Sequence, residues 1–241
     1  NSATDNDSRR EEDKMMKQLE INIPKLPYAL EEAMNRLRVN IKFCGDQTRK
    51  LMVTSSVPNE GKSFVSVHLW EMLAKMGMPS VLVDIDLRKS VIEEDYHYLY
   101  SGELKGLDHY LSGISEEEEI IYHTNIENGD IIPVANHLEN PSTLLEDPRM
   151  KKLLESLAEK YRYVILDTPP LQSVSDGNLI TALSDGVILV VRGESTSKKL
   201  VRNSLHQIES CNGRLLGMVL NRVKIDQHAY YKYYGEYGEY K

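Results

Sequence analysis

Two kinds of hydrophobic pattern alternate along this chain from residue 50 onward. Short runs rich in Val, Ile and Leu are separated by longer stretches in which apolar residues recur at helical spacing. Continuous apolar runs of this kind are typical of parallel strands buried on both faces, with helices between them that cover the sheet. The pattern predicts an α/β fold with a doubly wound, mostly parallel sheet of about six to eight strands and helices on both faces.

Each run defines one element. The predicted strands are KLMVTS (50–55), SVLVDID (80–86), DIIPVA (130–135), YVILDT (163–168), DGVILVVR (185–192) and LLGMVLNRV (215–223). The predicted helices between them cover residues 62–77, 141–160, 173–183 and 196–211. An amphipathic helix is predicted earlier, in ALEEAMNRLRVNIKF (29–43), because its apolar residues recur every three or four positions.

The same pattern divides the chain into three parts. Residues 1–22 are read as a flexible polar lead-in, residues 23–226 as one α/β domain, and residues 227–241 as a flexible tail. A length of 241 residues is enough for one large domain with a substantial core.

Composition narrows the function. The net charge of -8 argues against a general nucleic-acid binder. The two cysteines, Cys44 and Cys211, match no metal or redox spacing and are interpreted as reduced thiols. No apolar run is long enough to span a membrane, and no secretory signal is recognisable. We expect a cytoplasmic protein whose membrane link, if it has one, comes from a partner or a further segment.

The stretch TSSVPNEGKSF (54–64) joins the first predicted strand to a helix and ends in the Gly-Lys-Ser of a phosphate-binding loop. Backbone N–H groups of such a loop bind phosphate, Lys62 adds positive charge, and the Ser63 hydroxyl suits Mg²⁺. Ser56 stands where the pattern has its first glycine, and it is small enough to replace it. The candidate nucleotide-binding residues are Ser56, Val57, Pro58, Asn59, Glu60, Gly61, Lys62, Ser63 and Phe64.

Acidic residues end two other predicted strands. Asp84 and Asp86 follow Val81-Leu82-Val83, and Asp167 ends YVILD as in a Walker B element. Solvent-facing acids would be the plain alternative, but an unpaired acid at a buried strand end is costly, and a bound cation would resolve the repulsion. Together with Gly-Lys-Ser, these strand ends indicate a P-loop NTPase fold with a Mg²⁺–nucleotide site.

Two further features carry chemistry. Asn221 and Arg222 end the last predicted strand and are candidates for contact with the base. The chain finishes in YYKYYGEYGEYK, which holds Tyr230, Tyr231, Tyr233, Tyr234, Tyr237 and Tyr240. The simplest interpretation is a low-complexity tail whose aromatic residues bind a partner nonspecifically. Its lack of periodicity and its glycines also suit a flexible phosphate acceptor.

These segments resemble the bacterial tyrosine kinases, a P-loop family that controls capsule and exopolysaccharide assembly. The resemblance covers residues 24–241 and rests on SSVPNEGKS (55–63), VLVDIDLRKS (81–90) and YVILDTPP (163–170). These are similar to the family's Walker A, second Walker A and Walker B elements. Softer matches are GLDHYLSG (106–113), NPSTLL (140–145) and the tyrosine cluster.

The resemblance implies a protein-tyrosine kinase that uses ATP and Mg²⁺. Lys62 and Ser63 would bind phosphate and metal, Asp86 and Asp167 would position the metal, and Asp84 would take the proton from an incoming tyrosine. Lys62, Asp84 and Asp86 are thus the implied catalytic residues. The tail tyrosines would be the acceptors, phosphorylated between subunits of a ring-shaped homo-oligomer.

The resemblance also implies partners and a location. These are a membrane-bound activator of the chain-length-regulator type, a cognate tyrosine phosphatase and no nucleic acid. The kinase would lie in the cytoplasm at the inner face of the membrane, held there by its activator.

Two departures from the family pattern stand out. The oligomerisation helix (30–43) carries Glu32, Asn35 and Arg38 where the family has Glu-x-x-Arg-x-x-Arg, so its middle arginine is missing. Arg36 is one position away, which is about 100° around a helix, and is no simple substitute. VANHLENP (134–141) lacks the family's glycine before Asn-Pro, which predicts a loop difference.

Two other functions stay open at this point. A partition-type or positioning ATPase switch would carry a second lysine at the position of Val57. A non-catalytic scaffold would bind nucleotide and present the tail to a polysaccharide-assembly partner.

Overall fold

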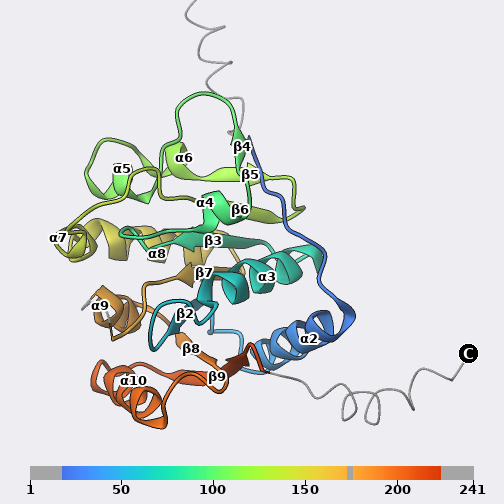
Figure 1. Cartoon of the computed structure of the whole chain (residues 1–241). Coiled ribbons are helices and arrows are strands. Elements are labelled where there is room, and N and C mark those ends of the chain that lie inside the picture. The colour runs from blue at the N-terminus through green and yellow to red at the C-terminus, as the bar shows by residue number, and fades with distance from the viewer. Residues whose placement is uncertain (1–17, 173–175, 224–241) are drawn as a thin grey trace, which may run out of the picture.

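One sheet runs through the middle of the molecule, in a computed structural model that describes residues 18–172 and 176–223 (Figure 1). Its nine strands lie in the order β4-β1-β5-β6-β3-β7-β2-β8-β9. They are β1 (Gln18–Glu20), β2 (Lys50–Ser55), β3 (Ser80–Asp84), β4 (Leu99–Tyr100), β5 (Tyr122–Thr124), β6 (Gly129–Ile132), β7 (Tyr163–Asp167), β8 (Gly186–Arg192) and β9 (Leu215–Asn221). The strands from β6 to β9 in this order are all parallel to one another.

Helices cover both faces of the sheet (Figure 1). They are α2 (Tyr28–Lys42), α3 (Lys62–Lys75), α4 (Ile92–Asp95), α5 (Leu107–Leu111), α6 (Glu117–Ile120), α7 (Ser142–Leu145), α8 (Pro148–Lys160), α9 (Asp176–Leu183) and α10 (Lys198–Ser210). Alternate residues of each strand point to opposite faces, so Leu51 and Val53 join a core beneath α2 and α3. Met52 joins a second core beneath α8 to α10. The predicted two-sided burial of the sheet is therefore confirmed.

The parallel part of the sheet consists of the strands predicted from the sequence. The sheet has nine strands rather than about six to eight, because β1, β4 and β5 extend one edge. These strands are two or three residues long, which is too short for a periodic pattern to mark them.

The lead-in prediction is wrong for residues 18–22. Leu19 and Ile21 are 1% and 2% exposed and join the core beneath α3. The N–H of Ile21 donates to Asn125 Oδ1 at 2.9 Å, and β1 pairs with β4 and β5. Two buried apolar side chains and these backbone bonds outweigh the polar character of the flanking residues. Residues 1–17 lie outside the described residues.

Prolines move several predicted boundaries. The helix predicted over 141–160 is two helices, because Pro148 cannot continue a helix and instead starts α8. Asp147 caps α8 by accepting the N–H of Arg149 at 2.9 Å. The strand predicted over 130–135 ends at Ile132, before Pro133. Without a proline, the strand predicted over 80–86 also ends early, at Asp84.

None of the described helices is both long and apolar enough to cross a membrane.

Candidate nucleotide site at the carboxyl edge of the sheet

The candidate site lies where three adjacent strands end. β3, β7 and β2 are neighbours, and Asp84 at the end of β3 pairs in register with Asp167 at the end of β7. Val53 of β2 flanks Asp167 on the other side, and β2 ends two residues later at Ser55. The topology brings the predicted motifs to one edge of the sheet, as expected for ligand sites of this fold class.

The loop between β2 and α3 has the shape of an anion-binding loop. Asn59 and Gly61 have left-handed backbone conformations, with φ of 65° and 94°. Such turns point successive N–H groups to one side. Helix α3 begins at Lys62, so the N–H groups of its first turn have no intrahelical acceptor and lie at the positive end of the helix dipole. A phosphate group suits this position.

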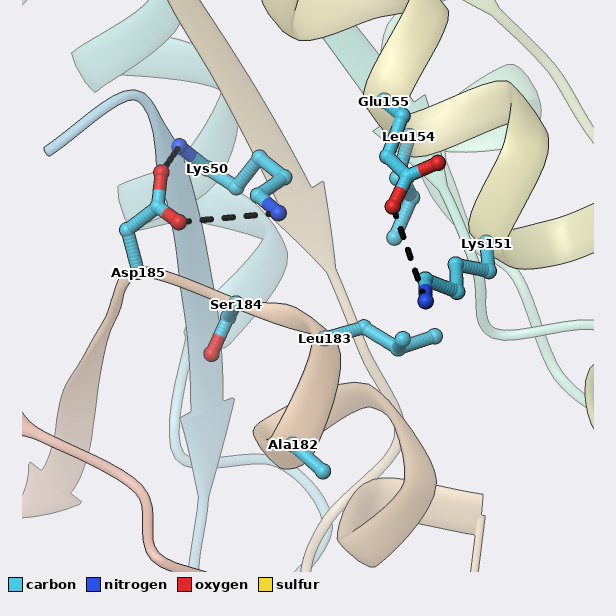
Figure 2. A pocket seen from close by; sticks show the side chains of 8 residues that line it. All are labelled: Lys50, Lys151, Leu154, Glu155, Ala182, Leu183, Ser184 and Asp185. Carbon is cyan, nitrogen blue, oxygen red and sulfur yellow. Dashed lines mark hydrogen bonds and ion pairs between the residues drawn. The ribbon is translucent and has the colours of Figure 1, made fainter. Parts of the chain in front are cut away.

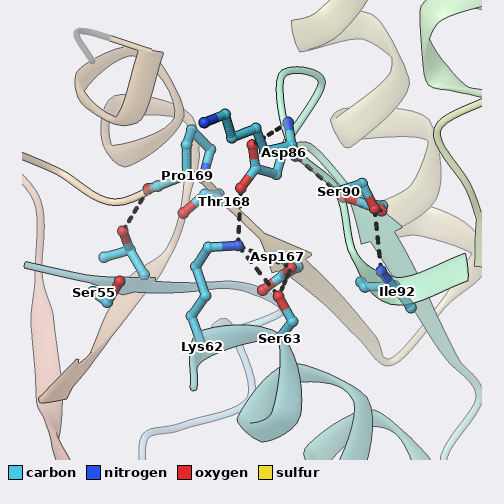
Figure 3. Close-up of polar contacts among 12 residues, drawn as sticks. Ser55, Lys62, Ser63, Asp86, Ser90, Ile92, Asp167, Thr168 and Pro169 are labelled. Carbon is cyan, nitrogen blue, oxygen red and sulfur yellow. Dashed lines mark hydrogen bonds and ion pairs between the residues drawn. The ribbon is translucent and has the colours of Figure 1, made fainter. Parts of the chain in front are cut away.

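Lys62 is the cation of the site. Its Nζ lies 3.0 Å from Asp86 Oδ2 and 3.4 Å from Asp167 Oδ2, so it points between the two carboxylates (Figure 3). Burial alone would lower the pKa of Lys62, but the negative charges of Asp167, Asp86 and Asp84 raise it above its ordinary value. Lys62 therefore stays protonated at neutral pH and can neutralise phosphate oxygens.

Asp167 is fixed by two hydroxyl groups from α3. Ser63 Oγ donates to Asp167 Oδ2 at 2.7 Å, and Ser66 Oγ donates to Asp167 Oδ1 at 2.8 Å. The sequence predicted Ser63 and Asp167 as metal ligands, but it did not predict the contact with Ser66. Since residues three apart share a helix face, the spacing of Ser66 from Ser63 is the signal in the sequence that could have found it.

Asp84 is buried, and its carboxylate bonds the segment that follows β3. Its Oδ2 accepts the hydroxyl of Ser90, and its Oδ1 accepts the N–H of Asp86 at 3.2 Å. Burial and the charge of Asp167 raise the pKa of Asp84 to about 8, although the Ser90 hydrogen bond lowers it. A carboxyl group with a pKa near the working pH suits a general base. Ser90 was not predicted, since nothing in LRKS marks its hydroxyl.

Ser63, Asp86 and Asp167 fit a Mg²⁺ ion that is also bound by a nucleotide. A hydroxyl and two carboxylates are hard oxygen ligands, and Mg²⁺ usually takes one or two carboxylates plus substrate phosphate oxygens and waters. No group of three or more His, Cys, Asp or Glu side chains in residues 18–172 and 176–223 is arranged to hold a metal unaided. Ser63, Asp86 and Asp167 together with phosphate oxygens and waters suit Mg²⁺.

Asn221 lies against the phosphate loop. Its Nδ2 donates to the carbonyl of Glu60 at 2.9 Å, and its Oδ1 accepts the N–H of Arg222 at 2.8 Å. Arg222 is exposed, with a left-handed φ of 52°. The structure thus gives Asn221 a role in holding the loop, and contact of either residue with a base stays a prediction.

Arg88 anchors the segment that carries Asp86, and sequence reasoning missed it. Its Nε donates to Asp176 Oδ2 at 3.0 Å and its guanidinium also bonds Ser142 Oγ at 3.2 Å. Asp176 is 1% exposed, so this ion pair is largely shielded from water. The bonds tie the loop after β3 to the starts of α7 and α9.

Other predicted residues lie apart from this site. Glu32 and Arg38 are half-buried on α2, and Arg38 Nε is buried without a hydrogen-bond partner among the described residues. The predicted acceptors Tyr230, Tyr231, Tyr233, Tyr234, Tyr237 and Tyr240 lie outside the described residues.

A hollow lies at the amino ends of the parallel strands, beside the start of β2 (Figure 2). Its lining residues are Lys50, Lys151, Leu154, Glu155, Ala182, Leu183, Ser184 and Asp185. The charged groups pair with one another, Lys50 with Asp185 at 3.5 Å and Lys151 with Glu155 at 3.7 Å. It holds none of the predicted residues, and its charges are already compensated.

A strand, a Gly-Lys-Ser loop, a helix and an acid on the adjacent strand together define a P-loop nucleotide-binding protein. The family described as AAA domain matches residues 58–219. The chain is 35% identical over 222 residues to tyrosine-protein kinase CpsD of Streptococcus agalactiae, covering 91% of this chain and 96% of that protein. It is 31% identical over 206 residues to tyrosine-protein kinase YwqD of Bacillus subtilis (strain 168), covering 85% of this chain and 86% of the relative.

Solved structures agree with this similarity. The kinase domain of the Escherichia coli tyrosine kinase ETK has a TM-score of 0.75 and 31% identity, covering 85% of this chain and 83% of that chain. The chain therefore belongs to the bacterial tyrosine-kinase family and is a protein-tyrosine kinase with the P-loop NTPase fold.

Proposed function

We propose that this chain is an ATP- and Mg²⁺-dependent autokinase that phosphorylates its own C-terminal tyrosine cluster between subunits. In this way it regulates the biosynthesis and export of capsular or extracellular polysaccharide. The observation that carries the proposal is the position of Lys62, whose ammonium lies 3.0 Å from Asp86 and 3.4 Å from Asp167, beside the phosphate loop. A cation and two acids beside this loop support the binding of a γ-phosphate and its metal at this position.

The residues have separate tasks in the transfer. The tyrosine oxygen bonds to the γ-phosphorus, the bond from that phosphorus to the β–γ bridging oxygen breaks, and ADP leaves. Asp84 accepts the proton of the tyrosine hydroxyl, which its raised pKa favours. Lys62 and the N–H groups of the loop stabilise the charge on the phosphate oxygens.

Ser63, Asp86 and Asp167 would hold Mg²⁺ with the nucleotide bound. When bound, the metal neutralises charge on the β- and γ-phosphate oxygens. Asp167 is held for this task by Ser66, whose hydroxyl lies 2.8 Å from Oδ1.

The tail is proposed as the acceptor because it holds six tyrosines, Tyr230, Tyr231, Tyr233, Tyr234, Tyr237 and Tyr240, beyond β9. β9 ends at Asn221, at the carboxyl edge that also holds Lys62. Between subunits, one molecule's tail would enter the site of a neighbour.

Self-association is supported by α2, where Tyr28 is 68% exposed and Phe43, just after the helix, is 84% exposed. Together with Leu30 and Val39, which are 40% and 39% exposed, they group four exposed apolar side chains on or directly after one helix, and such a grouping favours a partner surface. Glu32 and Arg38 would contribute to the ring. A membrane-bound chain-length-regulator protein would activate the kinase at the inner face of the membrane, and a tyrosine phosphatase would reverse its product.

The test is Asp84→Asn, with nucleotide binding and phosphoryl transfer measured separately. We expect the dissociation constant of Mg-ATP to change less than threefold and the transfer rate to fall about 100-fold or more, because only the general base is lost. Calorimetry gives the first value, and the intact mass of the chain gives the second.

Asp46→Asn is the control, since Asp46 is fully exposed and contacts only Arg162 among the described residues. Unchanged transfer in Asp84→Asn would remove Asp84 from its role. A wild-type chain that binds Mg-ATP and transfers nothing, even with a membrane activator present, would favour the scaffold.

A further inference from the structure

Glu60 is a buried carboxylate inside the phosphate loop, and phosphate binding has no direct use for it. Glu60 is 1% exposed, and the donors that bind its carboxylate among the described residues are neutral. A buried anion beside a triphosphate would be unfavourable unless other groups neutralise it. Its contacts show how the chain meets this requirement.

Four donors bind the Glu60 carboxylate. Oε2 accepts the N–H of Ser56 at 2.6 Å and the N–H of Val57 at 2.9 Å, so it closes the first turn of the loop. Oε1 accepts the N–H of Arg192 at 3.0 Å and the hydroxyl of Thr196. One side chain thus joins the start of the phosphate loop to the end of β8 and to the segment that leads into α10.

The hydrogen bonds of Ser56 and Val57 have a consequence for the ligand. Their two N–H groups are already used within the protein, so phosphate is left with the amides from Asn59 onward. Because these bonds lie within the protein, the Glu60 carboxylate can hold the first turn of the loop in shape independently of a nucleotide.

A second bond explains why serine stands at the position of the first glycine. Ser204 Oγ of α10 donates to Ser56 Oγ at 2.9 Å, and both residues are 0% exposed. Glycine would leave the Ser204 hydroxyl in a buried position without this partner. α10 therefore contacts the phosphate loop at two separate points, through Thr196 at its entry and through Ser204.

We propose that Glu60 is a positioning residue that ties the phosphate loop to the β8–α10 connection and so sets the affinity for the nucleotide phosphates. Ser56 and Ser204 support the same tie. The inference rests on the proposed nucleotide site and goes beyond it, because it assigns the loop's shape to side-chain bonds within the protein. If the loop is correctly shaped for only part of the time, the apparent affinity falls by that fraction.

The experiment measures the binding of Mg-ADP by calorimetry, which needs no phosphoryl transfer. The main variant is Thr196→Val, which keeps the shape of the side chain and removes one donor to Glu60. We expect its dissociation constant to rise about tenfold, the effect of losing one hydrogen bond to a charged group. Glu60→Gln is the second variant. We expect a larger rise in its dissociation constant, because the NH₂ group of glutamine would replace one accepting oxygen and would face two N–H or O–H donors. The two changes together should be less than additive.

Thr181→Val is the matched control. Thr181 is buried, whereas Thr196 is half-buried, and the Thr181 hydroxyl likewise donates to an oxygen, the carbonyl of Gly177 at 2.7 Å, but within α9 and not to the loop. We expect a similar melting temperature for the two Thr→Val variants in the absence of nucleotide, with unchanged Mg-ADP binding only in Thr181→Val. A general effect on folding would shift both variants alike. For Thr196→Val we also expect a raised KM for ATP with a smaller change in kcat.

An unchanged dissociation constant in folded Thr196→Val and Glu60→Gln would overturn the proposal. Failure of the wild-type chain to bind Mg-ADP would overturn the nucleotide site and this inference together. Normal binding of Mg-ADP by a chain without kinase activity would contradict the proposed function and leave this inference standing.

Discussion

Gly61 is the residue on which the shape of the phosphate loop depends most directly. Its φ of 94° is a conformation that side chains rarely adopt, and a Cβ added to it would lie 2.1 Å from Asn221 Nδ2. Asn221 cannot move without giving up its bond to the Glu60 carbonyl at 2.9 Å. The conformation of the phosphate loop at Gly61 and the position of Asn221 at the end of β9 therefore depend on each other.

Gly61→Ala should abolish nucleotide binding in a chain that still folds. We expect the dissociation constant of Mg-ATP to rise at least 100-fold, because both the backbone strain and the contact with Asn221 oppose the loop conformation. Gly217→Ala is a control, since a Cβ there meets nothing within 4 Å. Binding of normal affinity in Gly61→Ala would show that the loop tolerates another shape.

At this scale the sequence predicted the groups that a motif defines and missed those that support them. Lys62, Ser63 and Asp167 follow from a strand–loop–helix and a strand that ends in an acid. Ser66, Ser90 and Arg88 act through other residues, and their partners are fixed only by the fold. Glu60 as a nucleotide-binding residue stays a prediction, and the bonds of its carboxylate to the loop and to Arg192 were not foreseen.

Helix α3 connects the site to the rest of the fold. It begins at Lys62 in the phosphate loop, and its buried face carries Trp70 and Leu73 into the core. Further along, Glu71 Oε1 bonds Lys75 at 2.6 Å, and Glu71 Oε2 lies 3.3 Å from His68 Nδ1. These bonds bind the last turns of the helix together.

The Glu71 contacts predict a pH dependence of stability. Burial would raise the pKa of Glu71, but the bonds to His68 and Lys75 lower it below its ordinary value of 4.5. A lowered pKa stabilises the folded state above the unfolded pKa, and this contribution is lost as the pH falls. Glu71→Gln should therefore lower the melting temperature at pH 7, by about 2–4 °C for about 1 kcal/mol. Calorimetric melts from pH 7 to pH 4 should show that difference shrink, and a constant difference would contradict the assignment.

Helices and strands could be predicted where their hydrophobic patterns are long, and were missed where the patterns are short. All strands of the parallel part follow from runs of apolar residues, and α2 follows from its amphipathic period. β1 and β4 are too short for this, and they form because Leu19 packs into the core and pairs with Tyr100. The helix predicted over 141–160 is divided at Pro148. This division could have been predicted, because proline favours the first position of a helix.

The candidate catalytic groups of the whole molecule lie at the carboxyl edge of the sheet, and β9 ends at the same edge. The order of β3, β7 and β2 brings Asp84, Asp167 and Lys62 together. Lys62 and Asp167, which are in contact, lie 105 residues apart in the sequence. The sequence predicted this convergence, because parallel strands share a carboxyl edge. Assembly of copies of the chain through α2 stays a prediction, because the family motif on this helix is incomplete, with Asn35 in place of its middle arginine.

The most direct test of the account follows phosphate on the tail of one molecule while another supplies the active site. Wild-type chain and Lys62→Met chain are each incubated with ATP and Mg²⁺, alone and mixed, and the intact masses are read. We expect stepwise addition of phosphate to the wild-type chain and none to Lys62→Met alone, because the variant lacks the cation between Asp86 and Asp167. In the mixture, Lys62→Met should gain phosphate from its neighbour. A Lys62→Met chain that gains phosphate alone, or one that gains none beside an active wild-type chain, would contradict transfer between subunits through this site.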